Sequence, residues 1–373
     1  MRDLDLVFST LDDLEAPVSW PDVERREPHR LPPGPGLGRR LLVAAVALAV
    51  AAAGIGLAFR ALSVGGPSSV TPVTDHGIAP TPTNGALLYA KRLSDGWSLF
   101  ALDPETGTER QITQGYRDYG SDWSPDGTRI VYDSESREGG QGIWVANADG
   151  SEATKLIDDG SVPAWSPDGT KIAFARADLG KMVPFGAGSA GTPFYLYVMD
   201  ADGTNVQRLT DGRFSDYSPA WSPDGTQIAF VRYGREGAGL YVINADGSAV
   251  RQVAGPGVEI FGAPAWSSDG TSIAIAVNGA KNGPPGGILL LPADGTGEGT
   301  MIPGTEAEYP GYVSNPAWSP DGEWIAYLHG NQGELVILHP DGSDRRMMNV
   351  DPETDSIEEL AWGAAPPTVS PSG

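Results

Sequence analysis

The chain has 373 residues, which is ample for one large domain with accessory segments. Its formal net charge of −23 argues against nucleic acid as a partner, because Lys and Arg contacts to phosphate dominate that kind of binding, and against adsorption to anionic lipid. The sequence contains no cysteine, which excludes disulfides, thiolate metal sites, cysteine nucleophiles and an acylated cysteine anchor.

Residues 1–40 are polar and rich in proline, and we expect a largely disordered cytoplasmic tail. An apolar island at Trp20 leaves open a second interpretation, a short docking peptide for a cytoplasmic protein. Such a peptide would matter if the chain signals across a membrane.

Residues 41–60 are predicted to form a transmembrane helix. Leu41–Phe59 is a run of nineteen residues without a charge, and a run of this length is long enough to span a bilayer. Arg39 and Arg40 precede this run and a lone Arg60 follows it, so the positive-inside rule places the N-terminus in the cytoplasm and the following residues outside. A cleaved signal peptide and a twin-arginine signal are the alternatives. We expect a single-pass protein of the cell membrane.

Residues 61–84 are rich in Pro, Ser and Thr and predict a tether, and residues 364–373 predict a disordered tail. Between them, a tryptophan recurs about every 42 to 56 residues, a period typical of propellers and solenoids. These tryptophans, which we expect to pack between repeats, are Trp123, Trp165, Trp221, Trp266, Trp318 and Trp362.

Each repeat reads as four antiparallel strands. Five of the tryptophans are followed by a turn of the Ser-Pro-Asp-Gly type and a short apolar run, as in Trp221 to Phe230. A third strand, a second turn ending in Asp-Gly and a fourth strand complete the unit. Residues 86–113 supply three strands without the first, and Ile357–Trp362 supplies a first strand alone. The sequence therefore predicts an all-β, six-bladed propeller over residues 85–363 whose two ends join in one blade.

The repeated Ala-Trp-Ser-Pro-Asp-Gly, followed by Ile-Ala-Phe and later by Asp-Ala-Asp-Gly, resembles the WD40-like PD40 repeat of the TolB propeller family. Similar repeats form the propellers of tricorn-like and dipeptidyl-peptidase-IV-like proteins. The resemblance covers about 280 residues and implies the fold. TolB itself is a periplasmic partner-binding protein of an envelope complex, so the family also implies partner binding, although here a predicted anchor replaces the N-terminal domain of TolB.

An enzymatic function finds little support in the residues. The sequence has no Gly-x-Ser-x-Gly elbow and no catalytic domain beyond the predicted propeller, so no catalytic residue is assigned. The turn aspartates, such as Asp168, are expected to form turns. The four histidines are scattered, and no metal ligand or cofactor is assigned, with a calcium site in the central channel as the alternative.

The predicted binding surface is the channel mouth, where the connections between blades place an aromatic residue next to a carboxylate. Protein-binding hot spots use such mixed aromatic and polar groups. The candidate residues are Tyr116, Asp118, Tyr119, Phe214, Asp216, Tyr217, Glu259, Phe261, Tyr309 and Tyr312. The long insertion from Ala177 to Phe194 is expected on the same face, where it would cap the channel.

These observations predict a membrane-anchored, extracytoplasmic propeller that binds a protein or peptide of the cell envelope. Two alternatives stay open. One is a sensor that binds a small ligand or ion in the channel and signals through residues 1–40, and the other is a hydrolase or lyase that uses channel carboxylates.

Overall fold

The structure, a computed structural model, describes residues 84–366 apart from short gaps at 116, 136–140, 186–188, 213, 256–258, 280–284, 308–310, 331–332, 349 and 351–355. The predicted tail, transmembrane helix and tether therefore lie outside the described residues, except for Asn84. Within the described residues, no helix has the length and apolar character needed to cross a membrane.

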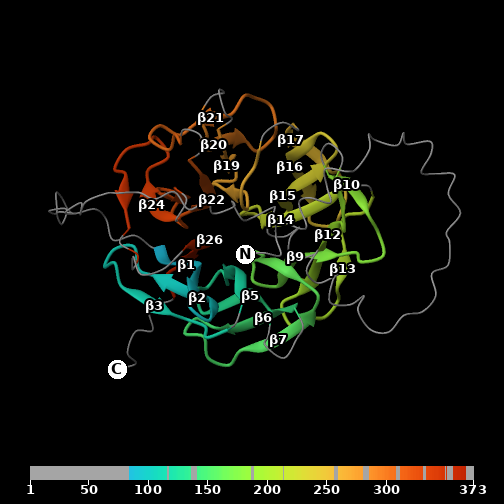
Figure 1. Cartoon of the computed structure of the whole chain (residues 1–373), viewed down its shortest axis with the longest axis horizontal. Helices are drawn as coiled ribbons and strands as arrows, with labels where there is room; N and C mark the ends of the chain where they lie inside the picture. The colour runs from blue at the N-terminus through green and yellow to red at the C-terminus, as the bar shows by residue number, and fades with distance from the viewer. Residues whose placement is uncertain are drawn as a thin grey trace, which may run out of the picture. The chain divides into compact units, whose positions relative to one another are not determined.

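Six four-stranded antiparallel sheets form the blades of a propeller and follow one another around a ring (Figure 1). This confirms the predicted all-β, six-bladed architecture. Blade 1 comprises β4 (Asp118–Trp123), β5 (Arg129–Glu135), β6 (Gln141–Asn147) and β7 (Thr154–Asp158). Blade 2 comprises β8 (Ser161–Trp165), β9 (Lys171–Ala177), β12 (Phe194–Asp200) and β13 (Gln207–Arg208). Blade 3 comprises β14 (Ser215–Trp221), β15 (Gln227–Gly234), β16 (Gly237–Asn244) and β17 (Arg251–Ala254).

Blades 4 and 5 repeat the same order of strands. They comprise β18 (Ala265–Trp266), β19 (Ser272–Val277), β20 (Gly287–Pro292) and β21 (Thr300–Met301), and β22 (Val313–Trp318), β23 (Ile325–His329), β24 (Glu334–Leu338) and β25 (Arg346–Met347). The first strand of each blade is its innermost one, as β14 and β22 show in Figure 1.

The sixth blade, called here the closing blade, joins the two ends of the propeller. It comprises β26 (Ile357–Ala364), β1 (Asn84–Leu93), β2 (Gly96–Leu102) and β3 (Glu109–Gln111). β26 pairs antiparallel with β1, with Trp362 opposite Leu87 and Ile357 opposite Lys91. The predicted closure is confirmed, and it places β1 between β26 and β2, so that β1 is not an open sheet edge.

The core lies between adjacent blades. Apolar residues of the two middle strands of one blade pack against those of the next, as Leu196 and Val198 of blade 2 do against Ile228 and Phe230 of blade 3. Each repeated tryptophan joins the cluster formed with the preceding blade, which confirms the predicted packing role. Burying such large rings contributes much of the energy that holds neighbouring blades together.

A β-bulge interrupts the innermost strand of five blades, three residues before the tryptophan. The bulge residues have a left-handed backbone, a conformation in which a β-branched side chain such as that of Val162 is strained. They are Gly120 (φ 47°), Val162 (φ 43°), Ser218 (φ 52°), Asn315 (φ 50°) and Glu359 (φ 55°). The bulges redirect backbone N–H groups, two of which meet carboxylates from another blade.

Candidate functional site

The mouth face is the face of the propeller that carries the connections from the last strand of one blade to the first strand of the next. Most of the predicted binding residues lie at the start of an innermost strand and therefore share this face. Asp118 and Tyr119 begin β4, Asp216 and Tyr217 lie in β14, and Tyr312 directly precedes β22. Glu259 is exposed before β18. Tyr116 and Tyr309 lie outside the described residues.

Four of the aromatic residues predicted at the mouth, Tyr119, Tyr217, Phe261 and Tyr312, each pack against a second aromatic ring. Two of their partners, Trp97 and Phe194, were not predicted from the sequence. Both lie at or next to the start of the third strand of a blade, and the turn before that strand opens on the mouth face, which is the signal that would have found them. The pairs, with their ring-centroid separations, are Trp97 with Tyr119 (5.3 Å), Phe194 with Tyr217 (5.1 Å) and Phe261 with Tyr312 (6.4 Å).

The two predicted aspartates of the mouth are buried and bonded within their own blades. Asp216 is fully buried and accepts hydrogen bonds from Nε (2.7 Å) and Nη2 (2.8 Å) of Arg232. Asp118 accepts bonds from the Ser134 hydroxyl (2.6 Å) and the Gly115 amide (3.0 Å), and burial raises the pKa of its carboxyl. Both carboxylates therefore stabilise the interior of the mouth and do not lie on its surface.

A pair of carboxyl groups lies beneath the mouth, where the bulges of three blades meet. Glu359 of β26 accepts a hydrogen bond from the Gly120 amide, and Asp133 of β5 accepts one from the Val162 amide (2.8 Å). A Cβ atom at Gly120 would clash with Oδ1 of Asp133, so the two carboxyls lie on either side of this glycine. Each carboxyl thereby ties one blade to the next around the ring.

The environment of this pair favours its neutral form. Burial raises the pKa of Glu359 to about 7. Burial, together with the negative charge of Glu359, raises the pKa of Asp133 well above its usual range. Burial raises the pKa of Tyr217 as well, and the negative charges of the same two carboxyls add to that increase. The pair therefore retains a proton near neutral pH, as closely spaced carboxyls do.

Two further carboxyls of the innermost strands, those of Glu358 and Asp122, also have raised pKa values. Burial and then the charge of Glu359 raise the pKa of Glu358 to about 7, against the opposing effect of Arg92. Burial also raises the pKa of Asp122 to about 7, although its carboxylate accepts bonds from the amides of Trp165 (2.7 Å) and Trp123 (2.9 Å). Among the described residues, no group of three or more His, Asp or Glu side chains is arranged to hold a metal ion.

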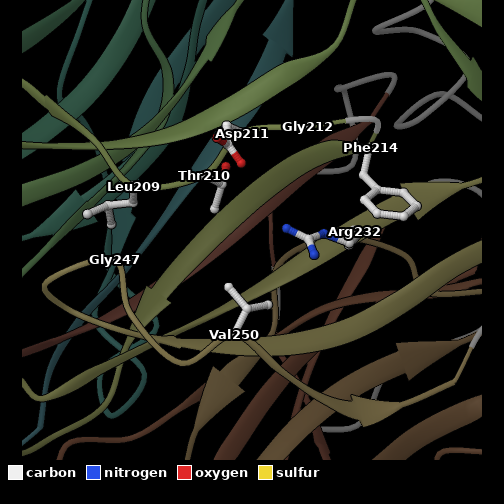
Figure 2. A pocket seen from close by; sticks show the side chains of 8 residues that line it. All are labelled: Leu209, Thr210, Asp211, Gly212, Phe214, Arg232, Gly247 and Val250. Carbon is white, nitrogen blue, oxygen red and sulfur yellow. The ribbon is translucent and has the colours of Figure 1, made fainter.

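A pocket of about 350 Å³ opens beside blade 3, between this blade and the segment that follows β13 (Figure 2). We call it the Arg232 pocket. The predicted residue Phe214 lines this pocket. The predicted residue Asp216 is buried and accepts hydrogen bonds from Arg232, which is also part of the lining. The lining residues are Leu209, Thr210, Asp211, Gly212, Phe214, Arg232, Gly247 and Val250.

The long insertion of blade 2 contains a short hairpin of β10 (Val183–Phe185) and β11 (Ser189–Gly191). β10 contacts β15 and lies at the outer side of the ring, so this hairpin does not cover the centre as expected (Figure 1). The Lys181 ammonium lies 5.4 Å from the centre of the Tyr195 ring and pairs with Asp178. These contacts keep the start of the insertion against its own blade.

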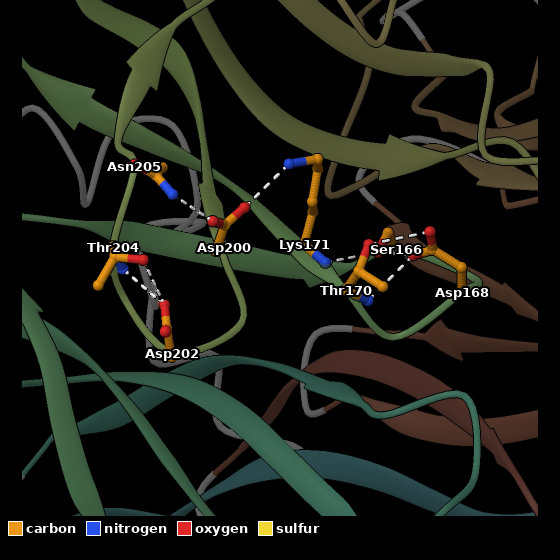
Figure 3. A network of polar contacts seen from close by, with 8 residues as sticks. All are labelled: Ser166, Asp168, Thr170, Lys171, Asp200, Asp202, Thr204 and Asn205. Carbon is orange, nitrogen blue, oxygen red and sulfur yellow. Dashed lines mark hydrogen bonds and ion pairs between the residues drawn. The ribbon is translucent and has the colours of Figure 1, made fainter.

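The face opposite the mouth is made of turns, and the turn aspartates shape them as predicted. In blade 2, Asp168 accepts hydrogen bonds from the Ser166 hydroxyl (2.6 Å) and the Thr170 amide (3.0 Å), and these bonds lower the pKa of its carboxyl (Figure 3). Asp200 pairs with Lys171 (2.9 Å) in the same network. These carboxylates are occupied by their own turns, which leaves the mouth face as the candidate functional site.

Comparison with known proteins supports the same family. Residues 183–351 match the PD40 family, described as the TolB beta propeller domain. An uncharacterized protein of Agrobacterium fabrum is 34% identical over 160 residues, which cover 41% of this chain and 53% of that protein. A TolB homolog of Chlorobaculum tepidum is 32% identical over 129 residues, which cover 35% of this chain and 28% of the homolog.

The chain thus spans about half of the first relative and less than a third of the second. The crystal structure of TolB from Acinetobacter baumannii superposes with a TM-score of 0.60 at 22% identity, over 75% of this chain and 66% of that chain. At this identity the likeness shows the fold alone. Together with the repeats and the closing blade, these matches show that residues 183–351 resemble the TolB beta propeller domain and that the whole propeller has the same fold as TolB.

Proposed function

We propose that this protein is a membrane-anchored, extracytoplasmic propeller that binds a protein or peptide of the cell envelope through its mouth face. The TolB-like family supports an envelope protein-binding role. The strong negative charge of the chain favours a partner with a basic surface.

The observation that carries this proposal is the set of aromatic pairs at the mouth. Tyr119, Tyr217 and Tyr312 are each partly exposed and each packed against a second ring. A rigid aromatic side chain contributes contact area at a small cost in conformational entropy, and such groups dominate protein-binding hot spots.

The anchor in this proposal is the uncharged run Leu41–Phe59, with the arginines before it setting its orientation. We expect the full chain to remain in the membrane pellet after extraction with alkaline carbonate. A protease added to intact spheroplasts should degrade the propeller and spare residues 1–40, which immunoblotting of tags at the two ends would show. A chain released by carbonate, or a protected propeller, would contradict the anchor and its orientation.

Partner binding is tested by affinity capture from the native envelope with residues 63–373 as bait. A variant with Tyr119, Tyr217 and Tyr312 all changed to alanine is expected to lose the specific partner, because a few central aromatics carry most of the binding energy. The matched control changes Val206 and Met347, which are exposed apolar residues of outer strands and turns, to alanine. The control should still capture the partner.

Equal capture by the wild type and the tyrosine variant would remove the mouth face from consideration. If no bait captures a specific protein, the ligand-sensing alternative becomes the stronger one, and Asp133 and Glu359 are the groups in the ring to examine for it.

A further inference from the structure

The Arg232 pocket holds a guanidinium in a fixed position. Two of the five N–H groups of Arg232 point to the buried carboxylate of Asp216. The guanidinium carbon lies 5.1 Å from the ring centre of Phe214, 5.2 Å from that of Phe230 and 5.0 Å from that of Tyr241. Because the aromatic rings and the carboxylate fix its orientation, a ligand need not order this side chain on binding.

The remaining N–H groups of Arg232 are available to a ligand. Among the described residues, Asp216 accepts the hydrogen bonds of this guanidinium through Nε and Nη2, and Nη1 does not bond to it. Figure 2 shows the guanidinium directed toward the interior of the pocket. A carbonyl oxygen of a ligand is therefore a suitable acceptor for Nη1.

The lining of the pocket carries charged side chains at two places, Arg232 and Asp211. The positive charge of Arg232 is already balanced by Asp216, and a second carboxylate, Asp211, is exposed on the lining. Arg208 donates a hydrogen bond to the backbone carbonyl of the lining residue Thr210, so Asp211 is the exposed carboxylate of a pocket whose other charges are cationic or paired. A neutral carbonyl at Arg232 and a cation at Asp211 match this distribution.

The rest of the lining is apolar. The side chains of Phe214 and Val250 are 42% and 43% exposed, which is high for apolar side chains. Leu209 lines the pocket with them, next to the turn at Gly247. A volume of about 350 Å³ is at the lower end for small-ligand pockets and accommodates one large apolar side chain with part of a peptide backbone.

We propose that the Arg232 pocket binds a short peptide segment of the partner in which a large apolar residue is followed by lysine or arginine. The apolar side chain packs against Leu209, Phe214 and Val250, a backbone carbonyl accepts a hydrogen bond from Arg232, and the basic side chain pairs with Asp211. This inference rests on the proposed function, since it assigns a sequence preference to a protein-binding propeller. It adds a second contact region beside the mouth.

Two blocked tetrapeptides test the proposal directly. The first is N-acetyl-glycine-leucine-lysine-glycine amide, and the second has glutamate in place of lysine. Saturation-transfer NMR on the leucine methyl groups, with the full chain in a mild detergent, would measure both dissociation constants. We expect the lysine peptide to bind at least about fivefold more tightly than the glutamate peptide, as one partly exposed ion pair allows.

Variants locate the binding. Asp211→Asn is expected to remove the preference for lysine, and Val250→Ser to weaken both peptides. Val206→Ser is the matched control, because Val206 is a similarly exposed valine (40%) outside the pocket, and it should leave both dissociation constants unchanged. Equal binding of the two peptides, no saturation with either, or insensitivity to Asp211→Asn and Val250→Ser would each overturn the proposal.

Peptide binding to the pocket and capture of an envelope protein are independent results. If the peptides do not bind but the wild-type bait still captures an envelope protein, the pocket inference is wrong and the proposed function stands. If the peptides bind as expected but no bait captures a protein, the pocket preference stands and the proposed envelope partner does not.

Discussion

Replacing Arg232 with alanine is expected to lower the free energy of unfolding by about 4 kcal/mol, because it leaves the fully buried carboxylate of Asp216 without its partner. Burial disfavours the charge on Arg232, yet the hydrogen bonds and charge of Asp216 raise the pKa of the guanidinium. The two charges therefore depend on each other. Urea unfolding of the full chain, followed by circular dichroism, would measure the loss.

The double variant Arg232→Ala, Asp216→Ala separates this cause from lost packing. Removing both charges should recover more than half of the lost stability, since no unpaired ion then remains. Ser134→Ala is the matched change in blade 1, where Asp118 keeps its bond from the Gly115 amide, and it should cost only about 1 kcal/mol. A double variant as unstable as Arg232→Ala would show that packing, not the buried charge, dominates.

Glu359→Gln is expected to stabilise the propeller at pH 8 by about 2 kcal/mol and to change little at pH 5. The pKa of Glu359 is about 7 in the folded chain against an ordinary value of 4.5. Between these two values the folded state binds more protons than the unfolded state, so wild-type stability falls as the pH rises through this interval and levels off above it. The full shift corresponds to about 3 kcal/mol, reduced by partial solvent contact.

Glutamine keeps an oxygen for the Gly120 amide and carries no charge, so the variant should lose most of this pH dependence. Removing the charge also lowers the pKa of Asp133, which flattens the profile further. Urea unfolding at pH 5, 6, 7 and 8 would give the two profiles. Glu323→Gln, at an exposed glutamate, should follow the wild-type profile. A Glu359→Gln profile as steep as that of the wild type would contradict the assignment.

The architecture was predictable because the turns and the tryptophan of each blade depend on residues that lie close together in the sequence. The turns in which an aspartate such as Asp168 bonds a serine hydroxyl depend on residues only a few positions apart, so they can be recognised in the sequence. The tryptophan at or near the end of each innermost strand recurs with the repeat, and the missing strands at the two ends predicted the closing blade. These features do not depend on the rest of the fold.

The state of the mouth aspartates was not predictable in the same way. Asp216 lies directly opposite Arg232 on the neighbouring strand, but a bulge shifts the register between Tyr217 and Ala220. Counting outward from the turn therefore gives the wrong cross-strand partner. The carboxyl pair is even harder to predict from the sequence, because Asp133 and Glu359 belong to different blades and come together only when the ring closes.

The pairing of β26 with β1 also sets the order of events during folding. β1 is among the first strands of the propeller to be synthesised, yet its partner, Ile357–Ala364, is the last. Until that segment appears, the edge of β1 next to Leu87 and Leu88 is unpaired and apolar. Contacts between such distant segments form slowly, so five blades can assemble while the sixth waits. During this interval the nascent chain is most exposed to aggregation, and a chaperone that covers β1 would protect it.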